Sequence, residues 1–416
     1  MELKRVVVTG LGAITPIGNT VEEFWTNLIN GVSGAAPITR FDTTKFKTKF
    51  ACEVKGFNAA DFFERKEARK LDLFAQYALV AAEQAIQDSS LDIESFDKDL
   101  GGVIWGAGIG GIITFLEETR SYIEGDGTPR FSPFFIPKMI SDIAAGHISM
   151  KYGFTGPNYG TVSACASSTH AIADAYNLIR LGKAKVFVTG GSEAAINEAG
   201  LGGFSSLQAI STRNDDPQTA SRPFDADRDG FVMGEGGGAL ILEEYEHAVA
   251  RGATIYCEVA GAGMSADAYH LTAPHPEGLG AKKVMLNTLD DGNIKPEEVD
   301  YINVHGTSTP LGDVSEIKAI EDVFGEHAYK LNISATKSMT GHLLGAAGVV
   351  ESIASILAIK NGVIPPTINQ FNLDERIDTK LNLTPNKAQN REVKVAISNT
   401  FGFGGHNASV AFKAIE

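Results

Sequence analysis

The chain has little cysteine. Its three cysteines, Cys52, Cys165 and Cys257, are far apart in a sequence of 416 residues, and their number is odd. This pattern excludes a disulfide framework and a CxxC-type zinc site, so we expect no bound metal. Unpaired thiols are typical of a reducing compartment, and the sequence therefore indicates a cytoplasmic protein.

Positive charge is also scarce. Lys and Arg total 36 against 51 Asp and Glu, which gives a formal net charge of −15 at pH 7. Nucleic-acid binding needs a basic face that neutralises phosphates, so this balance argues against it. The segment 65–70 is a local exception, because on a helix Lys66, Arg69 and Lys70 would project from one face. An ordinary solvated helix face and a docking patch for an acidic partner both fit this segment.

Long uncharged hydrophobic runs are missing from the sequence. Glu351 interrupts the apolar stretch 343–359, and residues 1–5 lead into a Val-rich segment instead of an apolar leader. We therefore expect no membrane span. With 43% hydrophobic residues, the chain is long enough to bury a large core.

Valine-rich segments alternate with helical patterns along the chain, which predicts an α/β fold with helices packed on sheets. The segments 236–244 and 404–412 resemble each other, and this echo predicts two duplicated halves, 1–250 and 251–416. A G-x-G-x-x-G pattern at 106–111 fits a dinucleotide fingerprint, but no second strand ending in an acidic residue follows it. A glycine-rich turn that permits close backbone approach fits this pattern better.

Cys165 lies in Thr161-Val-Ser-Ala-Cys165-Ala-Ser-Ser-Thr169-His, where a β-like run turns into an Ala-rich helical stretch. At a helix N-terminus, free backbone N–H groups and the helix dipole favour a thiolate over a thiol. We therefore expect a nucleophile whose pKa is lowered. Most cysteines serve as small buried hydrophobes, and for Cys165 taken alone that alternative stays open.

More groups suited to chemistry gather in the second half of the chain. His305 ends a strand-like segment, the usual place for sites in α/β sheets. Lys337 and His342 lie five residues apart, before a helical segment that contains Glu351. The loop 399–405, Asn-Thr-Phe-Gly-Phe-Gly-Gly, is flexible enough to present a backbone N–H. Each histidine alone also fits a structural role, but together with Cys165 they place three reactive groups at strand-to-loop junctions.

Four motifs carry a resemblance that covers essentially the whole chain: the Cys165 motif, His305-Gly-Thr-Ser-Thr-Pro-Leu-Gly-Asp, Lys337 with Gly-His342, and Gly402-Phe-Gly-Gly. Together they resemble the elongating β-ketoacyl-[acyl carrier protein] synthases, most closely the synthase II group of bacterial type II fatty-acid synthesis. The resemblance implies the thiolase-type fold, with two duplicated halves in a layered αβαβα arrangement. It also implies a homodimer, in which Phe134 and Phe135 line the partner's pocket.

The resemblance further implies the reaction, a decarboxylative condensation of acyl-carrier with malonyl-carrier that gives 3-oxoacyl-carrier and CO2. Cys165 would accept the acyl chain, and the backbone N–H groups of Cys165 and Phe403 would bind the oxyanion. Neutral imidazoles would stabilise the enolate, and a neighbouring lysine would keep them neutral. The corresponding residues are His305, His342 and Lys337, with Glu351 and Asp313 orienting the network.

The remaining implied roles concern binding. Thr307 and Thr309 match threonines that hold the pantetheine arm, and the acyl pocket, gate and other substrate contacts correspond to Ile109, Phe204, Phe401, Phe403 and Thr272. The docking patch Lys66, Arg69 and Lys70 would bind an acidic acyl carrier protein, although Gln208 stands where relatives often have an arginine. No cofactor is expected, because phosphopantetheine arrives on the carrier.

Four other functions share features with this sequence. A degradative thiolase shares the fold but typically has a second catalytic cysteine near the C-terminus, and no cysteine follows Cys257. A non-catalytic chain-length partner subunit usually lacks the nucleophile, so Cys165 argues against it. An NAD-dependent oxidoreductase would need the 106–111 loop to bind a nucleotide. A polyketide ketosynthase uses the same Cys-His-His set and stays open as the alternative.

Overall fold

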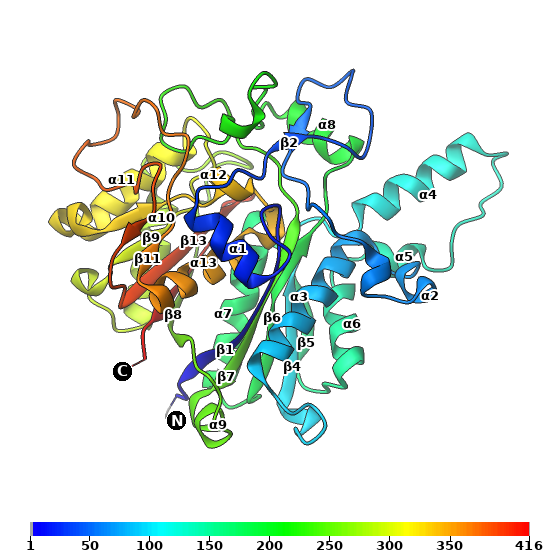
Figure 1. Cartoon of the computed structure of the whole chain (residues 1–416), viewed down its shortest axis with the longest axis horizontal. Helices are drawn as coiled ribbons and strands as arrows, with labels where there is room; N and C mark the ends of the chain where they lie inside the picture. Colours follow the sequence, from blue (N-terminus) through cyan, green and yellow to red (C-terminus); the bar gives the residue numbers. More distant parts are fainter. Residues whose placement is uncertain (1–2, 416) are drawn as a thin grey trace.

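The computed structural model describes residues 3–415, whose main sheet has ten strands (Figure 1). In sheet order they are β10 (Asn332–Ser334), β9 (Tyr301–Asn303), β13 (Val395–Gly402), β14 (His406–Lys413), β8 (Cys257–Ala266), β1 (Val6–Ile14), β7 (Gly236–Glu244), β6 (Val186–Glu193), β4 (Gly101–Gly106) and β5 (Asn158–Thr161). The two-stranded pairs β2 (Ala36–Pro37) with β3 (Phe50–Ala51) and β11 (Val363–Ile364) with β12 (Gln389–Asn390) lie outside it.

The strand order repeats about the centre of the main sheet. From β1 outward, β7 pairs antiparallel with β1 and β6 pairs antiparallel with β7. β4 then pairs parallel with β6, and β5 pairs parallel with β4. From β8 outward, β14 and β13 are added antiparallel and β9 and β10 parallel. The two five-strand sets meet where β1 pairs antiparallel with β8. This repeat supports the expected duplication, while the division at residue 250 itself stays a prediction.

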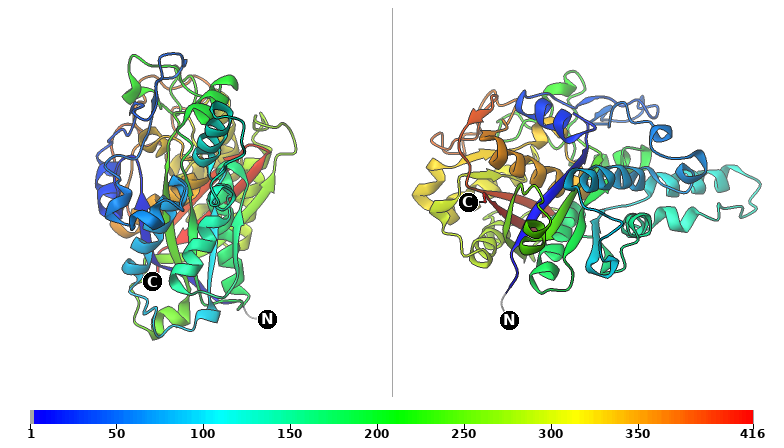
Figure 2. Two further views of the ribbon diagram at one scale, coloured as in Figure 1. Left: turned by 90° about the vertical axis from the view of Figure 1, so that its right-hand side faces the viewer. Right: turned by 60° about the horizontal axis from the view of Figure 1, so that its bottom comes forward.

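Helices cover both outer faces and fill the space between the two strand sets. They are α1 (Val21–Ile29), α2 (Arg65–Ala68), α3 (Leu73–Ser89), α4 (Ile112–Glu124), α5 (Phe135–Met139), α6 (Ile143–Tyr152), α7 (Ser167–Arg180), α8 (Glu198–Ser206), α9 (Tyr245–Ala250), α10 (Leu279–Asp291), α11 (Gly312–Phe324), α12 (Lys337–Thr340) and α13 (Ala347–Asn361). Turning the molecule by 90° places several of these helices in front of and behind the strands (Figure 2).

Side-chain alternation along the strands assigns each helix to a layer. In β6, Val186 and Val188 point toward α3, whereas Phe187 joins the cluster formed with α7 and α13. In β14, Ala411 faces α10 and α11, while Val410 and Phe412 face the central helices. Strands with both faces buried pack helices on each side. The layers therefore run helix, strand, helix, strand, helix, which confirms the predicted αβαβα arrangement.

The apolar stretch 344–361 is long and hydrophobic enough to cross a membrane by composition alone. In the structure it includes α13, and 83% of it is buried inside the protein. Its hydrophobic faces pack against α7 and both strand sets, so it is the central core helix of this fold.

One predicted helix is shorter than expected. The segment 65–70 was expected to form a continuous helix, but α2 ends at Ala68, with Arg69 as its C-cap. The side chains of Lys66, Arg69 and Lys70 are all exposed. Beside α2, the helix α4 projects from the body as an arm (Figure 1).

Candidate functional site

A cavity of about 380 Å³ lies where loops at the carboxyl ends of parallel strands converge. The loop after β5 supplies Cys165, the loop after β9 supplies His305, and the segment after β10 supplies His342. β5 and the pair β9–β10 lie at opposite ends of the strand order. The two strand sets pack on α7 and α13 between them, and this stacking brings the turn η3 with Cys165 against the segment that follows His342. The other expected site residues in the cavity wall are Phe204, Thr272, Thr307, Thr309, Phe401 and Phe403.

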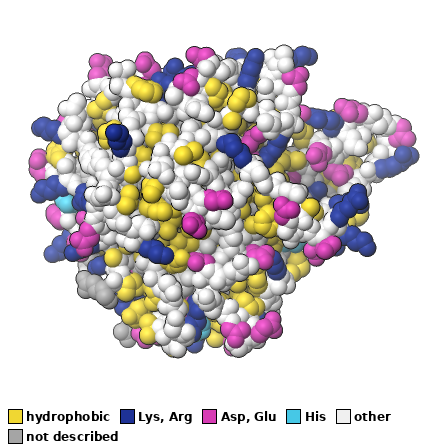
Figure 3. All heavy atoms as spheres, viewed as in Figure 1, with side chains coloured by type: hydrophobic (Ala, Val, Ile, Leu, Met, Phe, Trp, Pro, Cys, Tyr) yellow, Lys and Arg dark blue, Asp and Glu magenta, His cyan; other side chains and the backbone are white. Residues whose placement is uncertain are grey.

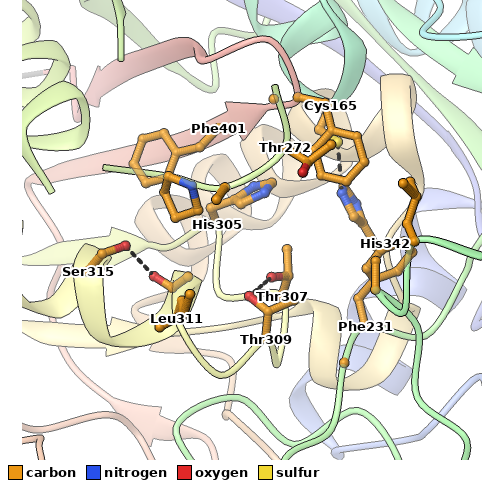
Figure 4. A pocket seen from close by; sticks show the side chains of 18 of the residues that line it. Cys165, Phe231, Thr272, His305, Thr307, Thr309, Leu311, Ser315, His342 and Phe401 are labelled. Carbon is orange, nitrogen blue, oxygen red and sulfur yellow. Dashed lines mark hydrogen bonds between the residues drawn. The ribbon is translucent and has the colours of Figure 1, made fainter. Parts of the chain in front are cut away.

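Cys165 sits on a tight turn between β5 and α7. The turn η3 (Ala164–Ala166) precedes the helix, and Ala164 has a φ of 51°, in the left-handed region that side chains rarely adopt. The surrounding structure holds this strained residue, and such strain typically marks functional turns. As a result the Cys165 Sγ projects toward the cavity, 3.0 Å from the His342 Nε2 (Figure 4).

The expectation of a lowered Cys165 pKa is wrong for the free protein. Burial raises the pKa of Cys165 to about 12 and outweighs the opposing Lys337 charge. Two backbone N–H groups, of Phe403 and of Cys165 itself, also act to lower it. A neutral thiol hydrogen-bonded to His342 is therefore the resting form, and the thiol loses its proton only as it reacts.

The two histidines face each other at the cavity wall. Their ring centroids are 5.3 Å apart and the planes cross at 86°. Burial lowers the pKa of each imidazole well below its usual value, and the nearby Lys337 charge lowers it further. Both rings are therefore neutral near pH 7, the form in which one ring nitrogen donates a hydrogen bond.

Lys337 and Glu351 form a buried ion pair behind the histidines. The lysine, at the start of α12, is 1% exposed, and Glu351 on α13 is 2% exposed. Burial raises the pKa of Glu351 to about 7, while the lysine charge acts to lower it. Neither residue lines the cavity, so the pair acts on the site through charge and packing.

Asp313 lies elsewhere than expected. Its carboxylate accepts hydrogen bonds from the backbone N–H groups of Ser308 and Phe224, at 3.1 and 2.9 Å, and pairs with the buried Arg228. It therefore holds the loop of Thr307 and not the Lys337 network. The hydroxyls of Thr307 and Thr309 are hydrogen-bonded to each other at 3.1 Å (Figure 4).

Sequence reasoning missed Glu316, which holds the His305 loop. Its carboxylate accepts hydrogen bonds from the backbone N–H groups of His305 and Gly306, both at 2.9 Å. Burial raises the pKa of Glu316 to about 7. A signal existed, since on α11 this acid falls within the apolar stripe that includes Ile317 and Ile320.

Aromatic rings close the cavity wall. Phe401 lies 5.6 Å from His305, and Phe403 lies 6.3 Å from Phe204, between ring centroids. Phe231, which the sequence did not single out, packs edge-on against His342 at 5.3 Å. Gln208 also lines the cavity, with a φ of 53°.

Ile109 does not belong to the cavity wall. It lies in the glycine-rich loop after β4, where the backbone N–H groups of residues 108–110 donate to the Glu193 carboxylate. These donors are thus not free for a pyrophosphate, which argues against nucleotide binding. A Cβ at Gly106 would stand 2.5 Å from the backbone of Ser167, so this glycine permits close packing against α7.

The described residues, 3–415, contain no group of three or more His, Cys, Asp or Glu placed to hold a metal ion. The docking patch Lys66, Arg69 and Lys70 lies outside the cavity wall. Lys70 Nζ is 5.7 Å from the centre of the Phe134 ring, which is itself 38% exposed.

Comparison with known proteins gives two family matches that together span most of the chain. The family described as "Beta-ketoacyl synthase, N-terminal domain" matches residues 3–248. "Beta-ketoacyl synthase, C-terminal domain" matches residues 256–371.

Individual relatives match over their whole length. A 3-oxoacyl-[acyl-carrier-protein] synthase 2 of Synechocystis sp. is 51% identical, over 100% of this chain and 99% of the relative. Among solved structures, a β-ketoacyl synthase from Burkholderia phymatum superposes with a TM-score of 0.92 at 34% identity, covering 99% of this chain and 100% of that one. A type II polyketide ketosynthase, solved with its acyl-carrier protein and a bound hexaketide, gives 0.89 at 35% identity, with 100% of both chains covered.

Proposed function

The chain belongs to the β-ketoacyl synthase family, and from that membership we propose that it elongates acyl chains by condensing acyl-[acyl carrier protein] with malonyl-[acyl carrier protein]. The products are 3-oxoacyl-[acyl carrier protein], two carbons longer, and CO2. One observation carries the assignment of residues: a thiol lies 3.0 Å from one neutral imidazole, and a second neutral imidazole shares the same cavity.

The first half of the reaction transfers the acyl chain to Cys165. The thiol proton moves to His342 Nε2 as the sulfur attacks the thioester carbonyl, and the pantetheine sulfur leaves with a proton. The tetrahedral oxyanion needs donors, and the N–H groups of Cys165 and Phe403 act on the same sulfur from two loops. Their convergence supports an oxyanion hole at this point.

The second half forms the carbon–carbon bond. Malonyl-carrier loses CO2, and the resulting enolate oxygen accepts hydrogen bonds from the neutral imidazoles of His305 and His342. Burial keeps these imidazoles neutral by lowering their pKa, and the Lys337 charge lowers it further, because a protonated imidazole beside a lysine is unfavourable. The enolate carbon then attacks the acyl-Cys165 carbonyl, and the cysteine sulfur leaves as a thiolate. It takes up a new proton from water, because its own proton departed on the pantetheine sulfur.

Binding roles follow from the position of each residue along the cavity wall. Thr307 and Thr309 present hydroxyls for the pantetheine arm, and Thr272 lies on a neighbouring loop. Phe204, Phe401 and Phe403 supply the apolar surface that an acyl chain requires. The role of Ile109 beside the acyl chain stays a prediction. The chain itself supplies the nucleophile and the donors, so the reaction needs no cofactor beyond the phosphopantetheine on the carrier.

The decisive experiment is a turnover assay with malonyl-carrier and acyl-carriers of graded length, with products identified by mass. We expect a single two-carbon extension per acyl-carrier, with the 3-oxoacyl-carrier product that the 51% identical relative's name contains. A product extended several times without reduction of the ketone would identify a polyketide ketosynthase instead. Absence of any condensation with active carrier substrates would contradict the proposal.

The acidic carrier protein is proposed to dock on the patch Lys66, Arg69 and Lys70. These exposed cations lie near the base of the α4 arm, a region where dark-blue Lys and Arg side chains appear in Figure 3. The complex of a related ketosynthase with its acyl-carrier protein supports a carrier as partner. Docking through such exposed charges speeds the association of the carrier protein with the enzyme and does not affect the chemical step.

Reversing Lys66, Arg69 and Lys70 to Glu is expected to raise KM for acyl-carrier about tenfold at low salt, with little change in kcat. The control is Lys183→Glu with Lys360→Glu. Lys183 follows the end of α7 and Lys360 lies in the last turn of α13, and both are exposed and outside the cavity wall. Steady-state kinetics at two ionic strengths measures the effect. An unchanged KM at low salt would remove the patch as a docking site.

A homodimer is proposed because β5 is an edge strand whose surroundings are apolar. Tyr159 is 39% and Val162 is 63% exposed, and Met150 on the adjacent α6 is 69% exposed. Unpaired edges and exposed apolar surface favour association with a second chain. Residues of the α4–α5 arm, including Phe134, would then reach the partner's site. A cytoplasmic location fits this function and the three unpaired cysteines.

A further inference from the structure

Glu193, the last residue of β6, carries a fully buried carboxylate that none of the proposed steps uses. It accepts hydrogen bonds from four backbone N–H groups. Gly108 donates at 2.7 Å, Ile109 at 3.1 Å, Gly110 at 3.0 Å and Gly345 at 3.1 Å. An ionised carboxylate has about four acceptor positions, so this one is nearly saturated by backbone donors.

Two glycines from different segments let the backbone approach the same oxygen of this carboxylate. A Cβ at Gly108 or at Gly345 would stand 2.8 Å from the Glu193 Oε2. At Gly345 it would also stand 2.2 Å from the Gly108 nitrogen. The loop 108–110 and the segment around Gly345 are thus both hydrogen-bonded to one side chain. Neither position 108 nor position 345 has room for a residue with a Cβ.

Both of these segments border the reactive pair. Gly345 follows His342 by three residues, in the turn η7 (Leu344–Ala346) that precedes α13. A Cβ at Gly108 would stand 3.2 Å from the carbonyl oxygen of Ala164, the residue before Cys165. One carboxylate therefore supports the segments on each side of the Sγ–Nε2 contact.

We propose that Glu193 is a positioning residue of the condensation, which holds the loop 108–110 and Gly345 in register around the Cys165–His342 pair. The inference rests on the proposed role of Cys165 as nucleophile. Glutamine cannot replace the carboxylate, because an amide has one accepting oxygen and directs its own N–H groups at the donors. At least one of the four backbone N–H groups would then lack an acceptor: that of Gly110, if the amide oxygen takes the Oε2 position.

Electrostatics gives this position a measurable signature. Burial raises the pKa of Glu193 to about 7, although its four N–H donors act to lower it. The Glu193 charge acts to raise the pKa of Cys165, opposite to Lys337. The other titratable groups at the thiol are His342 and His305, which are neutral above pH 6.5. Lys337 and Glu193 are the two charges that act on the thiol, and of these Glu193 is the one whose pKa burial raises to about 7. Glu351 and Glu316 also have a pKa of about 7, but their charges are not among those that act on the thiol.

The test is the rate of Cys165 alkylation by iodoacetamide in the full chain between pH 5.5 and 9, read by peptide mass. Below the thiol pKa, this rate is proportional to the thiolate fraction. In Glu193→Gln, alkylation should be about tenfold faster than in the unaltered protein above pH 8, because a charge that opposes the thiolate is gone. Below pH 6 the two rates should converge, because Glu193 is then protonated and neutral.

Two variants separate charge from structure. Glu193→Asp keeps the negative charge but has a shorter side chain. The alkylation rate of Cys165 in this variant should therefore remain slowed above pH 8, as in the unaltered protein. Glu316→Gln removes a comparably buried carboxylate that supports His305, and it should leave the pH dependence of Cys165 alkylation unchanged. A rate ratio that is constant from pH 5.5 to 9, or equal to one throughout, would overturn the proposal.

Turnover supplies the second readout. Glu193→Gln should lower kcat by about 100-fold, because a displacement of the reacting pair by about 1 Å has this effect. KM for malonyl-carrier should stay unchanged, because Glu316, Asp313 and Arg228 hold the Thr307 loop without Glu193. A rise in KM with unchanged kcat would contradict a positioning role. The alkylation assay needs no carrier substrate, so it stands even if the proposed condensation fails.

Discussion

Cys165→Ala is expected to abolish chain elongation while malonyl-carrier decarboxylation continues. Elongation needs a covalent acyl intermediate, and no other thiol can carry it, because Cys52 and Cys257 are buried in core clusters. Decarboxylation needs only donors for the enolate oxygen, and His305 and His342 remain in place. Loss of a nucleophile typically lowers the rate by four to six orders of magnitude, so 3-oxoacyl product should fall to the background level.

The measurement follows CO2 release and 3-oxoacyl product in parallel, with the same malonyl-carrier and acyl-carrier. Cys257→Ala is the matched control, because it also deletes a buried thiol but lies on β8 away from the cavity. It should elongate normally after a modest loss of Tm, as expected for a small core cavity. Elongation by the Cys165→Ala variant would show that another group accepts the acyl chain.

His305→Ala, added to the Cys165→Ala variant, is expected to lower malonyl-carrier decarboxylation by about 100- to 1000-fold. One preorganised donor to a developing oxyanion contributes about 3 to 4 kcal/mol. In this background acyl transfer does not occur, so CO2 release reports the enolate-forming step alone. His305 is half-buried and neutral, and its loss leaves His342 as the single imidazole donor.

His305→Asn should recover part of this loss, because its amide still donates an N–H. The matched control is His327→Ala, which removes an imidazole that bonds the Val299 carbonyl outside the cavity. It should leave decarboxylation unchanged. If His305→Ala decarboxylates at the rate of the parent variant, the enolate is stabilised by other groups.

Much of the site could be predicted because its reactive side chains lie in short sequence motifs. The strand-to-helix change around Cys165, the end of a strand at His305 and the pairing of Lys337 with His342 are local patterns. The layered fold followed from the same alternation, combined with the family resemblance. Local backbone preferences depend on neighbouring residues, so a sequence reveals them.

Other features depended on residues far apart in sequence. Glu316 and Glu193 had no motif, because their partners are backbone N–H groups, which every sequence position supplies. Asp313 was assigned to the wrong network, since its partners Arg228 and Phe224 are distant in sequence and reach it only in the folded chain.

The sequence by itself determined which groups this protein brings to the reaction: one thiol, two imidazoles, one lysine and a glycine-rich phenylalanine loop. Tertiary structure alone decided the protonation of the thiol. Cys165 was expected to be a thiolate at a helix start, yet burial raises its pKa to about 12 and leaves a neutral thiol against His342. Desolvation depends on everything packed around a group, whereas a motif records only the group's neighbours along the chain.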